Sequence, residues 1–177
     1  MKALALLTFL AVLPIVSADI GPEPHPIAAA SPTGRYVVRV VPEDHASAVA
    51  SVYELNKDGS TYTKQREFRL VERDSVIELC ISDSSEVVTF GSCGPQGAEQ
   101  AVVWHTSDGK VKRQYSLKEI LPAKAFSEVQ AKHQSRSSTN WRRGQPFFNG
   151  RALLIPDTVG GCVILGDNVI DYEPDQN

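Results

Sequence analysis

The sequence predicts a mainly β protein made of meandering antiparallel sheets, either propeller-blade-like or sandwich-like. Two observations predict this fold: apolar and polar residues alternate over short segments, and Asp-Gly pairs at 58–59 and 108–109 separate such segments. A third observation is that the apolar spacing becomes helical at one place only, near residues 116–133. We therefore expect a single β-rich domain over residues 31–172, followed by a flexible tail at 173–177.

The first eighteen residues have the three parts of a secretory signal peptide. Lys2 supplies the positive charge, residues 3–16 form an uncharged run, and Val16-Ser17-Ala18 offers small residues for cleavage. The run is shorter than the roughly 20 apolar residues that cross a membrane as a helix. We expect cleavage near Ala18 and a secreted or periplasmic protein without a membrane span.

Residues 19–30 are predicted to be a linker between the cleavage site and the domain. Pro22, Pro24 and Pro26 follow one another closely, and the segment has no apolar period. The net charge of the whole chain is −3. This balance argues against a general nucleic-acid partner, which normally meets a basic protein.

From Ser31 onward the pattern predicts a succession of short strands. Tyr36, Val38 and Val40 alternate with other residues, as in a strand with one buried face. The Asp-Gly pairs supply the positive φ angles of tight hairpins. The expected strands are residues 36–40, 49–55, 67–71, 76–81, 86–90, 101–104, 112–115, 151–155, 162–165 and 169–172.

The helical region begins with a capping box. Ser116 and Glu119 stand three residues apart, the spacing at which each caps the other's backbone amide. Leu117, Ile120 and Leu121 share a helical face, and Pro122 interrupts the run. With residues 123–133 continuing at helical spacing, we expect two short helices or one kinked helix.

The strand segments contain a weak internal repeat. The layout of residues 31–38 recurs at 82–89, and the two Asp-Gly pairs lie 50 residues apart. Residues 150–155 also echo residues 34–39. One interpretation is a repeated meander of up to four strands, about one propeller blade long. The other is that any β-meander with Asp-Gly turns produces such echoes.

The segment Ser31-Pro32-Thr33-Gly34-Arg35-Tyr36-Val37-Val38 resembles the strand motif of TolB-type and WD40-like β-propeller repeats. That motif favours Ser-Pro-Asp-Gly-Lys/Arg, so Thr33 departs from it. Residues 31–172 also resemble uncharacterised small exported bacterial proteins. The landmarks of this second resemblance are Ser82-Asp83, Val88-Thr89-Phe90, Asp108-Gly109-Lys110-Val111, Ser116 to Pro122, Ser137 to Arg142, and Leu154-Ile155-Pro156.

These resemblances imply a β fold and export, and no particular activity. In the second group a tryptophan–histidine loop follows the Thr-Phe strand, whereas this chain has residues 91–94 of Gly-Ser-Cys-Gly there. A closed propeller needs at least four blades. At about 50 residues per unit, residues 31–172 supply fewer than three. The chain must therefore stack its sheets as in a sandwich, close a ring with partners, or be a fragment-like relative of the repeat.

Motifs for catalysis, metals and cofactors are missing from the sequence. It contains no Gly-x-Ser-x-Gly, His-Glu-x-x-His or Cys-x-x-Cys and no phosphate-binding glycine loop. No cofactor is therefore expected. The enzymatic alternative is an exported hydrolase-like protein with a dispersed site around His105 and Cys93. Trp104, next to His105, is expected to close the β core.

The most distinctive stretch runs from residue 124 to residue 151. It interleaves basic and aromatic residues, a combination that suits anionic or planar partners through hydrogen bonds and cation–π contacts. Its members are Lys124, Lys132, Arg136, Arg142, Arg143 and Arg151, with Glu128 as the only acid, together with Trp141, Phe147 and Phe148. The candidate ligand-binding residues are Arg136, Trp141, Arg142 and Arg143.

A structural interpretation of this stretch competes with the binding one. Residues 152–177 carry five acids and no lysine or arginine, so the two blocks could neutralise each other, with Trp141 as a core anchor. The functional hypothesis is a noncatalytic binding or structural module for an unknown protein or anionic ligand. Its contact surface would be the loop from Arg136 to Phe148. On this hypothesis, alanine at Arg142 and Arg143 weakens binding and leaves thermal stability unchanged.

The three cysteines enter an oxidising compartment if the protein is exported. Cys93 and Cys162 lie in glycine-flanked segments where backbones can approach closely, which suggests a disulfide between them. Cys80 lies in an apolar run and is expected to be a buried thiol. All three could also remain free.

Overall fold

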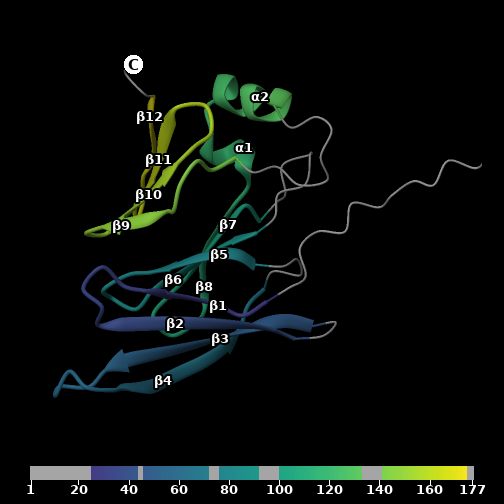
Figure 1. Cartoon of the computed structure of the whole chain (residues 1–177). Helices are drawn as coiled ribbons and strands as arrows, with labels where there is room; N and C mark the ends of the chain where they lie inside the picture. The colour runs from purple at the N-terminus through teal and green to yellow at the C-terminus, as the bar shows by residue number, and fades with distance from the viewer. Residues whose placement is uncertain (1–24, 44–45, 72–75, 92–99, 133–140, 175–177) are drawn as a thin grey trace, which may run out of the picture.

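The computed structural model describes residues 25–43, 46–71, 76–91, 100–132 and 141–174, which form three four-stranded sheets and two short helices (Figure 1). All strand pairs within the sheets are antiparallel, and each strand pairs with its neighbour in the sequence. Each sheet is therefore a meander. The predicted fold class, mainly β with meandering antiparallel sheets and short helices near 116–133, is confirmed.

Sheet 1 is formed by the first four strands. They are β1 (Ile27–Ala30), β2 (Tyr36–Glu43), β3 (Ala46–Leu55) and β4 (Tyr62–Arg69). Strand β1 falls within the segment expected to be a linker. Its residues after Pro26 are small and apolar, and they pair with β2 in regular register.

Sheet 2 is the middle sheet. Its strands are β5 (Val76–Ile81), β6 (Val87–Gly91), β7 (Val102–His105) and β8 (Val111–Tyr115). Every residue of β6 and β7 is buried, as expected of strands covered on both faces. Leu79, Ile81 and Val87 belong to the core against sheet 1, whereas Cys80, Val88 and Phe90 are among the residues packed toward sheet 3.

The two helices connect sheet 2 to sheet 3. They are α1 (Leu117–Ile120) and α2 (Ala123–Lys132), and the Glu119 carboxylate accepts a hydrogen bond from the Ser116 backbone N–H at 2.7 Å, as the predicted capping box requires. Sheet 3 then follows with four short strands. These are β9 (Phe147–Asn149), β10 (Ala152–Pro156), β11 (Gly161–Leu165) and β12 (Ile170–Pro174).

The segments that echo one another in the sequence occupy equivalent turns of successive meanders. Ser31 and Ser82 each begin the turn between the first and second strands, and in both turns a residue with positive φ follows three positions later: Gly34 at 72° and Ser85 at 61°. The Asp58-Gly59 and Asp108-Gly109 pairs both lie between the third and fourth strands. The described residues form three meanders, whereas a unit length of about 50 residues predicted fewer than three. The third meander fits because sheet 1 begins earlier than expected, at β1, and sheet 3 is built from residues 147–174 alone.

Sheet 2 separates two hydrophobic cores. The core between sheets 1 and 2 is aliphatic and small, with Val38, Val40, Ala50, Val52 and Leu70 packed on the three sheet 2 residues named above. The core between sheets 2 and 3 is larger, contains Trp104, Trp141, Phe90 and Phe148, and is shared with both helices. In Figure 1 sheet 1 lies below, sheet 2 in the middle, and sheet 3 with the helices above.

The three sheets converge at their first strands. Cα atoms of β1 and β5 approach within 8 Å, and so do those of β5 and β9. Stacked sheets normally lie about 10 Å apart, so this edge is unusually close. Among the described residues the last strands β4, β8 and β12 make no comparable approach to one another. The sheets are thus arranged as a fan that opens from the first strands toward the last.

Candidate functional site

The residues predicted to bind a ligand are divided by the structure between interior and surface. Trp141 is 1% exposed and Arg142 is 7% exposed, so both are buried, whereas Arg143 is exposed. Arg136 lies outside the described residues. The backbone holds this segment in place, since Arg143 N donates to Pro156 O at 3.0 Å and Thr158 N donates to Trp141 O at 2.9 Å.

Arg142 is part of the contact between sheets 2 and 3. Its guanidinium forms an ion pair with Glu78 of β5 and lies over the ring of Phe90, 4.7 Å from the ring centroid. The Trp141 ring flanks the same guanidinium at 6.0 Å. The predicted role of Trp141 as a core anchor is confirmed. Arg142 thus pairs with an acid of sheet 2, whereas the structural interpretation had set the basic stretch against the acidic block at 152–177.

A buried carboxylate fixes the turn that receives this segment. Asp157 is fully buried, and its Oδ1 accepts hydrogen bonds from Val159 N at 2.9 Å and Gly161 N at 2.7 Å. Its Oδ2 accepts one from the Tyr172 hydroxyl at 2.7 Å. Burial and this carboxylate raise the pKa of Tyr172 above its ordinary value. A Cβ at residue 161 would lie 2.1 Å from the Tyr172 hydroxyl oxygen, so only glycine fits there.

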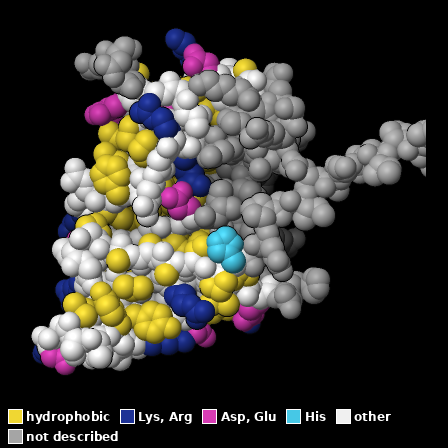
Figure 2. Space-filling model, viewed as in Figure 1, with side chains coloured by type: hydrophobic (Ala, Val, Ile, Leu, Met, Phe, Trp, Pro, Cys, Tyr) yellow, Lys and Arg dark blue, Asp and Glu magenta, His cyan; other side chains and the backbone are white. Residues whose placement is uncertain are grey.

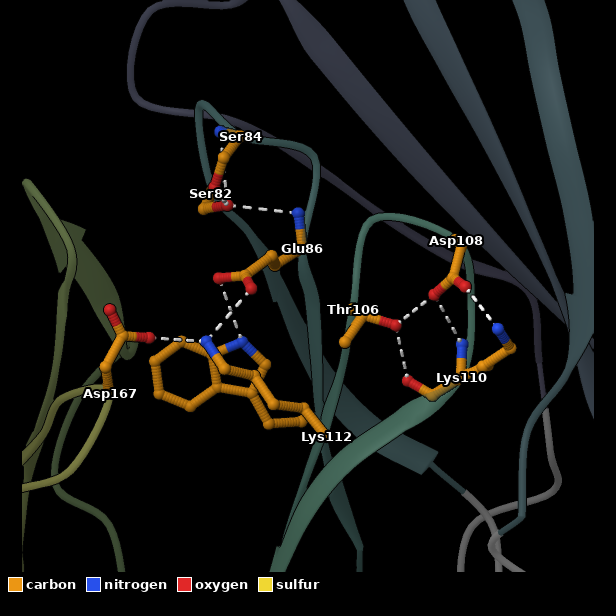
Figure 3. A network of polar contacts seen from close by, with 9 residues as sticks. Ser82, Ser84, Glu86, Thr106, Asp108, Lys110, Lys112 and Asp167 are labelled. Carbon is orange, nitrogen blue, oxygen red and sulfur yellow. Dashed lines mark hydrogen bonds and ion pairs between the residues drawn. The ribbon is translucent and has the colours of Figure 1, made fainter.

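A second polar network joins sheets 2 and 3 at their outer ends (Figure 3). Lys112 of β8 bridges Glu86, at 3.0 Å, and Asp167, at 2.6 Å, and its ammonium lies 4.6 Å from the Trp104 ring centroid. The Trp104 indole N–H also donates to Glu86, at 3.3 Å. Trp104 closes the β core, as predicted. These charged groups hold two sheets together and leave Lys112 only partly accessible.

The structure places His105 inside the core between sheets 1 and 2. The side chain is 0% exposed and contacts Phe68 of β4, with 5.2 Å between ring centroids. Burial lowers its pKa to about 4, so the imidazole is neutral at pH 7. Cys93 lies outside the described residues. The histidine on which the hydrolase-like alternative depends is therefore inaccessible to a substrate in this structure.

The cysteines differ in their surroundings. Cys80 is a buried free thiol, as predicted; it donates to Pro146 O at 3.0 Å, and burial raises its pKa to about 12. Cys162 is also free and is half-buried. The suggested Cys93–Cys162 disulfide is therefore not present in the structure. Cys162 lies on a regular strand whose glycine neighbour serves the Tyr172 contact, so the flanking glycines do not signal a bridge.

Two hollows border the segment from Arg143 to Phe148. One, of about 470 Å³, lies where β1, β5 and β9 meet and includes Pro32, Leu79, Cys80, Gln145 and Phe148 in its lining. The other, of about 710 Å³, lies on sheet 3 and is lined by Arg143, Pro156, Cys162, Tyr172 and Glu173, among others. Phe147 lines both hollows and is 51% exposed.

Phe147 belongs to an apolar row across the outer face of sheet 3. Strand register pairs Phe147 with Leu154, Leu154 with Ile164, and Ile164 with Asp171. Because neighbouring residues of a strand point to opposite faces, Phe148 faces the core and Phe147 faces outward. The sequence analysis included Phe147 in the distinctive stretch but not among the candidate ligand-binding residues. A strand of three residues is too short for an alternation that would predict which way the Phe147 side chain points.

The described part of the chain contains neither a cluster of metal-ligating side chains nor a helix that could span a membrane. There, no cluster of three or more histidine, cysteine, aspartate or glutamate side chains is arranged to hold a metal ion. Neither described helix has the length and apolar character needed to cross a bilayer. No protein-family model matches this sequence. A comparison with curated proteins likewise found no match.

Proposed function

We propose that this protein is an exported, noncatalytic binding module whose partner is another protein. The observation that carries the proposal is the side chain of Phe147, which is 51% exposed on the outer face of sheet 3 and borders two hollows. A large aromatic side chain held on a strand and left half in water is the kind of residue that dominates protein interfaces. Export is supported by the signal-like pattern of residues 1–18.

The surroundings of Phe147 suit a protein surface better than a small anion. Leu154, Ile164 and Cys162 on the same face are half-buried, so they extend the apolar surface around the ring. Arg143 is exposed at the edge of the larger hollow. The second arginine that could have bound an anion, Arg142, is already engaged with Glu78 inside the molecule.

An apolar centre with an arginine at its rim is typical of protein–protein interfaces. The interior of such an interface is depleted in charge, and aromatic and arginine side chains are enriched in it. We call the outer-face residues Phe147, Leu154, Cys162 and Ile164, with Arg143, the Phe147 face. The sequence stretch predicted to contact a partner, Arg136 to Phe148, overlaps this face at Arg143 and Phe147.

Site-specific photocrosslinking tests the proposal. A benzophenone amino acid is introduced at Phe147 in the full-length protein, in the cells that produce it, and the exported fraction is irradiated and separated on a denaturing gel. We expect a discrete covalent adduct. The same probe at Val111, which is 38% exposed on β8 of sheet 2, is the matched control and is expected to give none.

The arginine provides a second variable. Arg143→Ala, combined with the probe at Phe147, is expected to lower the adduct yield several-fold, because the cation at the rim of the face is removed. The proposal is wrong if the probe at Phe147 gives no adduct, or if the probes at Phe147 and Val111 give the same ladder of products. An adduct yield that does not respond to Arg143→Ala would remove Arg143 from the Phe147 face.

A further inference from the structure

Both ends of the fan carry a sheet face with half-exposed apolar side chains. On sheet 3 this is the Phe147 face. On sheet 1 the strand register places a corresponding set on the side opposite the core, which we call the outer face of sheet 1. Its members are Val37, Arg39, Val41, Glu43, Val49, Ser51, Tyr53, Lys64, Glu67 and Arg69.

The outer face of sheet 1 has an apolar centre. Val38, Val40, Ala50 and Val52 point to the core, so their sequence neighbours point outward. The outward valines and Tyr53 are half-buried. Figure 2 shows hydrophobic side chains over the lower part of the molecule, where sheet 1 lies, and others at the upper left over sheet 3. One side of the molecule therefore presents apolar surface at both ends of the fan.

The two faces carry opposite charges. Exposed cations Arg39, Lys64 and Arg69 lie on the outer face of sheet 1, with Glu67 and Glu43 as its acids. On sheet 3, Asp171 and Glu173 occupy the outward positions of β12, opposite Ile164 and Cys162. Strands β10 to β12 contain no lysine or arginine. Cations thus outnumber acids on the outer face of sheet 1, whereas the last strand of sheet 3 is acidic.

The molecule already contains this type of contact twice. Sheet 1 packs on sheet 2 and sheet 2 packs on sheet 3, each through an apolar core. At the outer end of the second contact, Lys112 on the last strand of sheet 2 meets Asp167 beside the last strand of sheet 3, at 2.6 Å. A cation on one last strand and an acid near the next is thus a contact that the fold itself uses.

We propose that the Phe147 face binds the outer face of sheet 1 of a second copy of this chain, and that two copies close into a ring of six sheets. The proposal rests on the proposed function, because it names the partner of the Phe147 face. In the fan each sheet is rotated relative to the one before it about the edge formed by the first strands. Repeating this rotation in a second copy closes a ring in the manner of a propeller. In a two-copy ring both copies make the same two contacts, so neither fan end remains bare.

The contact places Lys64 and Arg39 of one copy against Asp171 and Glu173 of the other, and the acids Glu67 and Glu43 of the same face are those available to Arg143. Exposed ions lose hydration on approach, so these pairs select the partner face more than they add affinity. Lys64 and Arg69 also form exposed ion pairs, with Glu67 and Glu43. Exposed pairs of this kind are weak and can exchange partners on association. The apolar centres, Tyr53 with its valines and Phe147 with Leu154 and Ile164, supply the burial.

Charge reversal on either face tests the ring by light scattering coupled to size exclusion. Protein expressed from the full-length sequence, the parent, is expected to have the mass of a dimer. Two variants are each expected to have the mass of a monomer: Arg39→Glu/Lys64→Glu on sheet 1 and Asp171→Lys/Glu173→Lys on sheet 3. Each variant should weaken association at least ten-fold. Mixed in equal amounts, the two variants should again form a dimer, because both contacts then pair opposite charges.

Lys118→Glu/Lys124→Glu on the helices is the matched control, since both lysines are exposed and on neither face; it should stay dimeric. Four results contradict the ring: a monomeric parent at 100 µM, association unchanged by either face variant, no dimer in the mixture, or assemblies larger than a dimer. A monomeric parent that still gives a discrete adduct from Phe147 in cells would end the ring proposal and leave the proposed function standing.

Discussion

The two contacts made by sheet 2 are built differently. Toward sheet 1 it presents aliphatic side chains and His105, and hydrogen bonds bridge the two sheets, such as Thr33 with Asp83 and the half-buried Arg66 with Ser85. Toward sheet 3 it presents aromatic rings, shares its core with two helices, and adds the Arg142–Glu78 and Lys112–Asp167 ion pairs. The first contact combines aliphatic packing with hydrogen bonds, whereas the second adds ion pairs among aromatic rings.

The difference explains why part of the basic and aromatic stretch at 124–151 lies inside the molecule. Sheet 3 has short strands and, without the segment around Trp141, would cover less of sheet 2. Trp141 and Arg142 fill this space, and the guanidinium needs an acid once it is buried. Glu78 supplies that acid. The cluster that looked like a ligand site is thus mostly a joint between sheets.

The largest expected effect comes from breaking this joint. Arg142→Ala leaves Glu78 without its ion pair and removes the guanidinium from Phe90, so we expect the free energy of unfolding to fall by about 3 kcal/mol. This reverses the expectation that residue 142 can be changed without loss of stability. Urea denaturation followed by circular dichroism measures the change.

The neighbouring arginine is the matched control for that experiment. Arg143 is exposed, so Arg143→Ala should change stability by less than about 0.5 kcal/mol. In the double variant Arg142→Ala/Glu78→Ala, part of the loss should return, because no unpaired charge remains. Equal effects of the two arginines would show that Arg142 does not contribute to the joint between sheets 2 and 3.

The fold was more predictable from the sequence than the site, for a physical reason. Alternating apolar residues and the Asp-Gly turns report local backbone preferences, and these are read without knowing the neighbours. The turn residues Ser31 and Ser82 could be matched for the same reason. What a buried arginine pairs with depends on which strand packs against it, and Glu78 lies 64 positions away from Arg142.

The strands that the sequence did not reveal are those without alternation. Strand β1 is Ile-Ala-Ala-Ala after three nearby prolines, and β9 has three residues. Both lie at the converging edge of the fan, where small size and short length allow the close approach of β1, β5 and β9. In β9 the alternation of side chains turns Phe148 toward the core and leaves Phe147 exposed.

The contact between sheets 1 and 2 should show a pH-dependent loss of stability of intermediate size. His105 is buried between sheets 1 and 2, and burial lowers its pKa from 6.5 to about 4. Between these values the unfolded chain binds a proton that the folded chain does not, so the free energy of unfolding decreases as the pH falls. From pH 6.5 to pH 5 we expect a loss of about 1.5 kcal/mol from this group.

The variant His105→Gln separates this loss from other titrations. Glutamine does not titrate, so its stability curve should be flatter than that of the parent between pH 6.5 and 5, whatever its absolute stability. Carboxyl groups such as Asp83 and Glu119 have lowered pKa values and contribute mainly below this window. Parallel curves for the parent and the variant would mean that His105 does not remain neutral inside this contact.

The smallest expected effect is at the turns that join sheets 1 and 2. Asp83 accepts hydrogen bonds from the Thr33 N–H at 3.1 Å and the Thr33 hydroxyl at 2.5 Å, and the hydroxyl lowers the pKa of Asp83. Thr33 is the residue that departs from the aspartate favoured by the resembling propeller motif. Thr33→Asp places a second carboxylate against Asp83 and removes the hydroxyl donor, so we expect a loss below about 1 kcal/mol.

Salt identifies the cause of this loss. Because both groups are exposed, repulsion between two carboxylates is screened, and the melting temperature of Thr33→Asp should approach that of Thr33→Asn in 0.5 M salt. At low salt the aspartate variant should melt lower, since only it adds a charge. If the two variants melt together at low salt, charge at this turn does not matter to the contact between sheets 1 and 2. Its stability would then come from the aliphatic core and the hydrogen bonds of Arg66 to Ser85, in contrast to the ion-paired contact to sheet 3.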